Sequence, residues 1–288
     1  TGRAGHTLPL AEVGPSAYEN INQTLSLAVQ NADHMAELKG GEQQVPEELF
    51  PNQRMDMTDN TQKWVNLRTR SHFNWGELEA GLYHEKVDHS MDFGPDKRFW
   101  YGTASGGPNG INGSGNGQPC SPIGPMCAAG MPMDSEGKTT GASLKASIDL
   151  SPMDVLRVGS EYQRYRLNDY WDPSGAMMWP GTFDNINDGE RDRAALFSEW
   201  ESQVAPDWLT LLGVRYENVR MDTGEVQGYG NMMGNQITEA AAFNARDRSQ
   251  TDHNWDATAL AAWTVDNNLN VEFGFARKVR SPNLYERY

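Results

Sequence analysis

Sulfur-bearing side chains gather in one Gly- and Pro-rich segment of the 288-residue sequence. The two cysteines, Cys120 and Cys127, lie there together with Met126, Met131 and Met133. The residues between the cysteines are enough to close a short disulfide ring, and a disulfide suits an oxidising compartment. We therefore expect a Cys120–Cys127 disulfide. The alternative is a soft-metal capture loop, because sulfur ligands select Cu(I).

Other methionines and aromatic residues occur in segments that we expect to be loops. The methionines form pairs at Met55/Met57, Met177/Met178 and Met232/Met233, and the aromatic residues are Phe99, Trp100, Tyr101, Trp171, Trp179 and Tyr229. Exposed methionine is unusual, so these pairs indicate either copper handling or a hydrophobic grip on an organic ligand such as a metal chelate. The aromatic rings could stack on a planar ligand, and ordinary packing between loops is equally consistent with both sets.

Patterns typical of enzymes and of nucleic-acid binding are absent from the sequence. We find no Gly-rich phosphate motif between a strand and a helix, no His/Cys zinc spacing and no nucleophile elbow. We therefore predict that the protein is not an enzyme and holds no cofactor. The formal net charge of -15 repels nucleic acid. Acidic residues between 184 and 192 could hold Ca²⁺ through carboxylate oxygens, although solvated loop charge is the simpler interpretation.

Side chains of alternating character indicate the strands that would position these groups. Leu269 and Val271 share one face of such a segment, whereas Glu272 lies on the other. The same alternation predicts strands at about 61–73, 76–91, 139–150, 155–170, 190–204, 208–222, 252–265 and 269–280. One more strand is expected near 18–29, and residues 28–38 could instead form a short helix.

The predicted strands form hairpins that are short-turned at one end and joined by long loops at the other. Short turns are predicted near 74–76, 151–154, 205–207 and 266–268, and long polar loops at about 93–138, 172–189 and 224–250. Such loops are uncommon in a compact soluble domain, whereas a membrane barrel has short periplasmic turns and long outer loops. Each strand exceeds the ~9–11 residues that cross a bilayer. We therefore expect an all-β fold, a partial antiparallel transmembrane β-barrel in which 1–288 is a single barrel segment.

Properties of the whole chain fit this fold. Mean hydropathy is -0.69, and no apolar run approaches the ~18–20 residues that a membrane helix needs, which excludes a helical membrane protein. Aromatic residues near predicted strand ends fit an interfacial girdle, with Trp200, Trp208, Tyr216 and Trp263 as candidates. A soluble β-sandwich would show similar alternation, but rarely strands and loops of this length. The sequence starts at Thr1 without methionine and stops after a predicted strand, so we expect a segment of a longer protein.

The stretch after the last predicted strand resembles a known family. Arg280, Pro282, Leu284, Tyr285 and Glu286 match an Arg-x-Pro-x-x-x-Glu-Arg-like stretch that follows a transmembrane strand in the later barrel of TonB-dependent receptors. The hairpin pattern before it agrees, so the resemblance covers most of the chain. It implies a location in the bacterial outer membrane and a complete barrel of about 22 strands with an N-terminal plug. This chain would hold about eight or nine of those strands, without the plug. The implied partners are outer-membrane lipid and, through the plug, the TonB complex of the inner membrane.

Two further stretches, 49–57 and 83–92, are similar to the copper-receptor branch of this family. In that branch a His-x-Met pair in the barrel supplies copper ligands, and the matching residues here are His89 and Met91. Leu82 sets the lipid-facing parity of the same strand, so both residues should point to the interior. Imidazole and thioether suit Cu(I). A solvated histidine and a packing methionine are the alternative.

The sequence thus predicts an outer-membrane TonB-dependent receptor that imports a scarce nutrient, with copper as the first choice. The metal ion would be the transported ligand and not a resident cofactor. A receptor for a ferric siderophore or another metal chelate is the close alternative, because most of the family's pattern is independent of substrate. A passive outer-membrane pore or a barrel-borne enzyme is a remoter alternative.

Overall fold

The computed structural model describes residues 16–50, 55–92, 132–174, 178–230 and 235–288, together with the backbone of 123–124 and 127–128.

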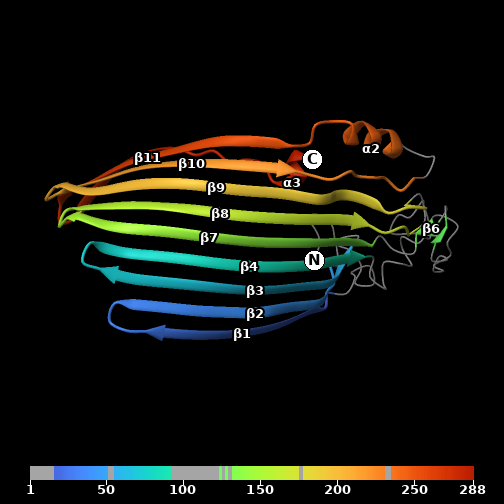
Figure 1. Ribbon diagram of the computed structural model, residues 1–288, viewed down its shortest axis with the longest axis horizontal. Coiled ribbons are helices and arrows are strands. Elements are labelled where there is room, and N and C mark those ends of the chain that lie inside the picture. The colour runs from blue at the N-terminus through green and yellow to red at the C-terminus, as the bar shows by residue number, and fades with distance from the viewer. Residues whose placement is uncertain are drawn as a thin grey trace, which may run out of the picture.

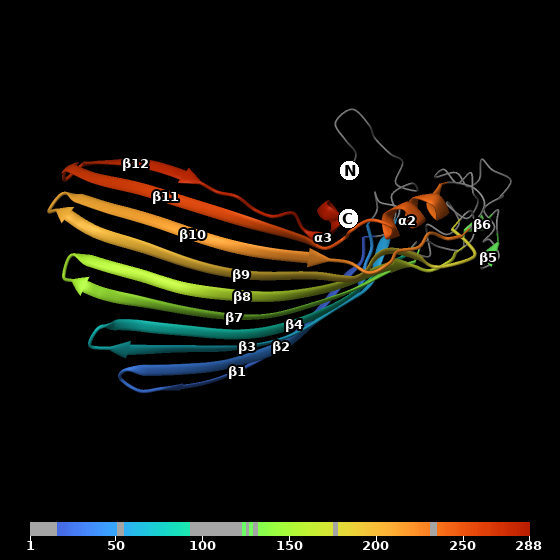
Figure 2. The same cartoon turned by 45° about the horizontal axis from the view of Figure 1, so that its top comes forward.

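The fold is a curved antiparallel sheet of ten strands in which each strand pairs with its neighbours along the chain (Figures 1 and 2). The strands are β1 (Tyr18–Gln30), β2 (His34–Glu48), β3 (Asp56–Phe73), β4 (Gly76–Asp92), β7 (Met133–Ser151), β8 (Asp154–Trp171), β9 (Phe183–Ala205), β10 (Trp208–Asp222), β11 (Gln250–Asp266) and β12 (Leu269–Arg277). A separate two-stranded sheet joins β5 (Ile123–Gly124) and β6 (Cys127–Ala128). The helices are α2 (Gln236–Asn244) and α3 (Leu284–Arg287). The predicted all-β fold and its meandering hairpins are confirmed.

The alternative prediction of a short helix over residues 28–38 is wrong. β1 ends at Gln30, and β2 starts at His34. The turn between them is closed by the Asn31 side chain, whose Oδ1 accepts hydrogen bonds from the backbone N–H groups of Asp33 (2.9 Å) and His34 (2.7 Å). Such Asx turns stabilise a chain reversal locally, which is why this segment forms a hairpin and not a helix.

Strand ends on the loop side differ from the predicted ones. β7 starts at Met133 and β9 at Phe183, several residues before the predicted 139 and 190, whereas β12 ends at Arg277 and not at 280. The extra residues of β7 and β9 are mostly polar, so the alternation that reveals a half-apolar strand is absent although backbone pairing continues. The predicted loop 224–250 contains α2. Residues 93–122 of the first predicted loop lie outside the described part of the chain.

The sheet has an inner face and an outer face, because successive residues of a strand point to opposite sides. Glu77 and Glu79 lie on the inner face, and Leu82, Leu196 and Phe273 lie on the outer face. These outer-face side chains are 56%, 63% and 59% exposed. A soluble sandwich would cover them with a second sheet, yet all ten long strands belong to one sheet. The apolar outer face is therefore open to its surroundings.

Aromatic side chains occupy both ends of the apolar outer face. At the turn end, Trp208 and Trp263 stack with ring centroids 5.4 Å apart, and the Trp263 indole N–H donates to Asp207 (3.0 Å). Toward the loops, Tyr216 and Trp255 pack with centroids 4.8 Å apart. This is the arrangement expected where strands cross two membrane interfaces. Neither described helix is long and apolar enough to span a membrane.

Candidate functional site

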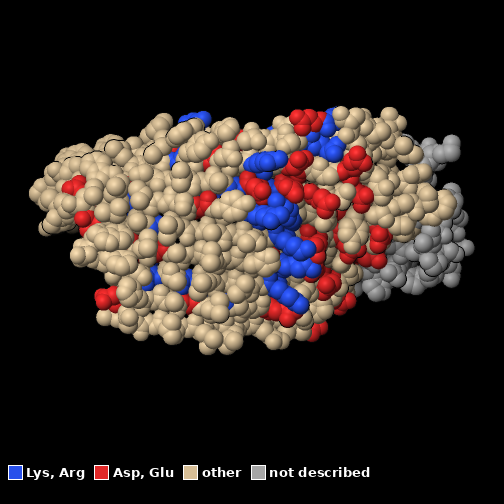
Figure 3. All heavy atoms as spheres, viewed as in Figure 1, with Lys and Arg blue, Asp and Glu red and all other residues tan. Residues whose placement is uncertain are grey.

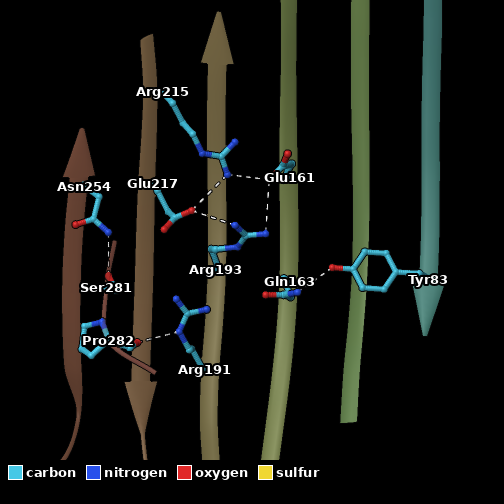
Figure 4. A network of polar contacts seen from close by, with 10 residues as sticks. All are labelled: Tyr83, Glu161, Gln163, Arg191, Arg193, Arg215, Glu217, Asn254, Ser281 and Pro282. Carbon is cyan, nitrogen blue, oxygen red and sulfur yellow. Dashed lines mark hydrogen bonds and ion pairs between the residues drawn. The ribbon is translucent and has the colours of Figure 1, made fainter. Parts of the chain in front are cut away.

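Ion pairs cover the inner face of the sheet. On β8, β9 and β10, Arg215 lies 2.7 Å from Glu161 and 3.3 Å from Glu217, and Arg193 lies 3.3 Å from Glu217 (Figure 4). A further contact of 3.6 Å between Arg193 and Glu161 closes a ring of alternating charge. The side chain of Glu217 is only 14% exposed. Because every member has an opposite partner, mutual attraction offsets much of the cost of desolvating these charges in a crowded interior.

A second set of ion pairs lies nearer the turns on the same face. Glu79 on β4 contacts Lys145 (2.5 Å) on β7 and Arg68 (3.1 Å) on β3. Arg157 on β8 contacts Glu199 and Glu201 on β9, both at 2.9 Å. The inner face therefore presents fixed charges of both signs from β3 to β10, a surface suited to a polar or hydrated occupant and not to lipid.

The residues after β12 fold back over the inner face. Ser281 Oγ accepts a hydrogen bond from the buried Asn254 side chain (2.8 Å), and the Pro282 carbonyl accepts one from Arg191 Nε (3.3 Å) (Figure 4). Leu284 is 1% exposed and packs in a small apolar core at the loop end. The other buried members of that core are Leu167, Ile186, Val219 and Met221.

The residues of the predicted family signature hold this turned-back segment together. Arg280 donates two hydrogen bonds, of 2.6 and 2.8 Å, to the Glu286 carboxylate. The same carboxylate accepts from the Asn283 backbone N–H (2.9 Å), and Asn283 Oδ1 accepts from the Glu286 N–H (2.8 Å), which together form a capping box for α3. Partial burial, with a smaller effect of the nearby Asp169, raises the pKa of the Tyr285 phenol.

His89 and Met91 lie on the inner face at the loop end of β4. Both have the parity of Glu77 and Glu79, as the sequence predicted, and both are half-buried. His89 Nδ1 lies 3.1 Å from Oδ1 of Asn60, the residue opposite it on β3. With that amide oxygen as acceptor, Nδ1 carries the hydrogen and Nε2 keeps a lone pair for a ligand.

Met91 lies between two other methionines in the register of the sheet. Met57 on β3 is its partner on one side, and Met133 on β7 is its partner on the other. Directly opposite residues have Cβ atoms about 4.5–5.5 Å apart, which long thioether side chains can span. The sequence placed Met57 and Met133 in separate groups, and it did not single out Asn60.

The remaining residues of the predicted sulfur loop cannot be compared with the prediction. Cys120, Met126 and Met131 lie outside the described residues, and Cys127 is placed only by its backbone in β6. The disulfide and the capture loop therefore stay predictions. Among the residues that the structure describes, no group of three or more His, Cys, Asp or Glu side chains gathers to hold a metal ion. The Met57–Met91–Met133 row is a candidate of a different kind, because its donors are thioether sulfurs.

Comparison with known proteins assigns the family. A sequence model described as the β-barrel of TonB-dependent receptor-like proteins matches residues 14–288. This chain belongs to the TonB-dependent receptor family. No match was found among curated protein sequences.

Solved structures of TonB-dependent receptors share the fold at low sequence identity. The copper transporter OprC is 16% identical with a TM-score of 0.69, and the match covers 94% of this chain and 38% of that one. The FrpB iron transporter from Neisseria meningitidis is 13% identical with a TM-score of 0.58, and the match covers 96% and 39%. The siderophore receptor PiuA from Acinetobacter baumannii is 11% identical with a TM-score of 0.54, and the match covers 90% and 42%. The chain thus spans about two fifths of the length of these structures, as expected for part of a TonB-dependent barrel.

Proposed function

We propose that this chain forms part of the wall of an outer-membrane TonB-dependent receptor that imports a metal, with copper as the transported ion. The observation that carries the proposal is the placement of His89 and Met91 on the inner face, beside the thioethers of Met57 and Met133. An imidazole and neighbouring thioethers form a soft ligand set, which favours Cu(I) over the hard cations that prefer carboxylates.

The surroundings of His89 support a ligand role. Asn60 holds the ring through Nδ1, so that Nε2 is free to bind. Outer partners of this kind orient a metal-binding histidine and fix its tautomer. A solvated histidine at a strand end would need no such partner. We infer that Met91 supplies the sulfur next to it, because residues two apart on a strand share a face.

In this proposal the ion binds at the loop end of the lumen and is released inward when the TonB complex acts on a plug. Both the plug and the TonB complex are partners that family membership suggests. Copper is substrate here and not a resident cofactor. The charged inner face would then line a hydrated path for the ion.

Copper titration of the full-length receptor tests the proposal. The double variant His89→Ala/Met91→Ala should weaken Cu(I) binding by at least about tenfold, because loss of a bound ligand typically costs more than 1.4 kcal/mol. The matched control is His84→Ala/Met153→Ala, which removes the same side-chain types elsewhere. His84 lies on β4 but on the outer face, where it contacts Thr140 (2.8 Å), and Met153 lies in an exposed turn. Unchanged calorimetric affinity in the first variant would contradict the assignment.

A receptor for a ferric siderophore is the second candidate, and the loop-side aromatic residues favour it. Phe183 and Tyr229 pack with ring centroids 5.5 Å apart at the loop end of β9. Burial, with a smaller effect of Asp172, raises the pKa of Tyr229 to about 12, so in the metal-free protein the phenol keeps its proton and can stack on a ligand or donate a hydrogen bond to it. Saturable binding of a ferric catecholate without any binding of Cu(I) would move the assignment to this candidate.

A further inference from the structure

A row of like charges crosses the outer face of the sheet. Lys63 on β3 is directly opposite Lys86 on β4, which is opposite Lys138 on β7, which is opposite Arg166 on β8. Arg164 lies on the same face of β8, two positions closer to the turn than Arg166. Arg220 lies on β10, and Asp192 on β9 lies between Arg164 and Arg220. We call these residues the basic belt: Lys63, Lys86, Lys138, Arg164, Arg166 and Arg220. Like charges directly opposite one another destabilise a sheet, so such a row needs anions nearby.

The basic belt lies at the loop-side margin of the apolar outer face. Arg164 is two residues beyond Tyr162, and Lys86 is four residues beyond Leu82; both apolar residues are exposed. Figure 3 shows this face, with a narrow column of Lys and Arg crossing the strands and the Asp and Glu residues concentrated on its loop side. The belt therefore separates an apolar zone from an acidic zone.

The carboxylates of this face satisfy only part of the belt. Glu136 contacts Lys86 (2.7 Å) and Lys138 (2.5 Å), and both oxygens of Asp192 are used by Arg166 (2.6 and 3.3 Å). Arg164 and Arg220, on either side of Asp192, are exposed and have no hydrogen bond or ion pair with any residue that the structure describes.

We propose that the basic belt binds the phosphate groups of a phosphorylated lipid in the outer leaflet, with Arg164 and Arg220 as the main ligands. The inference rests on the outer-membrane placement in the proposed function. The apolar zone would contact the acyl chains, and the belt would meet the headgroup just beyond them. Guanidinium groups pair with phosphate through two parallel hydrogen bonds, and Lys side chains reach from an apolar surface to headgroup level.

The acidic zone beyond the belt makes a soluble polyanion a poor occupant. Its residues line a hollow on the loop side of the belt and include Asp88, Asp134, Glu136, Asp184 and Asp188. An extended polyanion would have to cross this zone, whereas a lipid phosphate approaches from the apolar side. The order apolar, basic, acidic along each strand therefore matches an anion anchored in the membrane.

The double variant Arg164→Gln/Arg220→Gln tests the proposal in the full-length receptor. The protein is inserted into phosphatidylcholine vesicles that contain bisphosphorylated lipid A or its dephosphorylated form, and bound lipid is counted by native mass spectrometry across a titration. The wild type should prefer the phosphorylated form, and the variant should lose affinity for it by at least about tenfold, because charge-assisted hydrogen bonds to two guanidinium groups are removed. The control Lys39→Gln/Arg246→Gln removes the same net charge away from the belt and should behave as the wild type.

Three results would overturn the inference. They are equal binding of both lipid forms, an unchanged affinity in Arg164→Gln/Arg220→Gln, and complete competition by an equimolar amount of inorganic phosphate. The last would make the belt a site for free phosphate. Copper titration of the same samples separates this inference from the proposed function. Normal copper binding with no lipid effect contradicts the belt alone, whereas failure to insert into vesicles contradicts the outer-membrane placement itself.

Discussion

Glycines on the inner face allow aromatic rings from the next strand to lie across the backbone. A Cβ on Gly141 would overlap the Tyr83 ring, and one on Gly159 would overlap the ring of Phe197. Tyr83 then reaches past Gly141 to accept a hydrogen bond from Gln163 on β8 (3.0 Å) (Figure 4). These glycines are needed for close approach, and the rings cover backbone that glycine leaves bare.

We predict that Gly141→Ala lowers the stability of the receptor by about 1–3 kcal/mol, because the new methyl group must displace the Tyr83 ring. The control is Gly213→Ala on β10, where the nearest atoms to a new Cβ are 3.9 Å away. Urea unfolding of the full-length protein in lipid vesicles measures both. Equal stability of the two variants would show that the Tyr83 contact does not restrict this position.

The Arg280–Glu286 pair gives the turned-back segment a defined pH response. The hydrogen bonds from Arg280, and then that from the Asn283 backbone, lower the pKa of Glu286 from 4.5 to about 2. Because the folded-state pKa is the lower one, the carboxylate stabilises the segment above about pH 4.5 and loses this effect as the pH falls toward 2.

We therefore predict that protection of the Arg287 and Tyr288 amides from hydrogen exchange falls between pH 4.5 and 2, after correction for the intrinsic rate. In Glu286→Gln the protection should already be low at neutral pH and change little with acid. Glu239→Gln on α2 is the control and should follow the wild type. A Glu286→Gln protein as well protected as the wild type at pH 7 would contradict the role of the pair.

At the scale of elements, most hairpins could be predicted because one face of each strand is apolar. The hairpin of β3 and β4 shows how far the pairing can be predicted from the sequence. Counting back from the turn at 74–75 places Asn60 opposite His89, so that contact was accessible from the sequence. The pairing of Met57 with Met91 was not, because it depends on a register shift between Met57 and Asp59.

Partners separated by long loops could not be predicted either. The pairing of Met91 with Met133 joins β4 to β7, and a long segment between them sets no register of its own. The predicted strand 269–280 was too long because Arg280 and Pro282 belong to the turned-back segment, which depends on distant partners such as Asn254. The alternation of apolar and polar residues reveals a strand with one apolar face. Side-chain contacts between distant residues decide where that strand ends. The Cys120–Cys127 disulfide stays a prediction, which titration of thiols in unreduced protein would test.

A charged side chain should destabilise the protein more on the outer face of a strand than on its inner face. We predict that Val214→Lys, on the outer face of β10, destabilises the receptor by about 2–4 kcal/mol, the cost of a lysine at the bilayer midplane. Gly213→Lys, one residue earlier but on the inner face, should cost much less, because it lies among the charges of the lumen. Guanidinium unfolding in vesicles compares them, and a larger loss for Gly213→Lys would contradict the assignment of the faces.

At the scale of the molecule, one sheet separates an apolar surface from an ionic one. The ten strands form no second layer, and the edges at β1 and β12 are open in the sheet described here. Backbone groups at such edges need partners inside a membrane, which the rest of a closed barrel supplies. The proposed copper site, the turned-back segment and the proposed lipid-binding belt all derive their positions from this division of faces.

Accessibility of single positions along β10 tests that division most directly. In full-length protein with Cys120→Ser and Cys127→Ser, a nitroxide label is placed singly at Leu212, Gly213, Val214 and Arg215 in lipid vesicles. Labels at Leu212 and Val214 should collide more with oxygen dissolved in lipid, and labels at Gly213 and Arg215 more with a water-soluble nickel chelate. Loss of this alternation, or its reversal, would contradict a sheet with lipid on one face and the receptor lumen on the other.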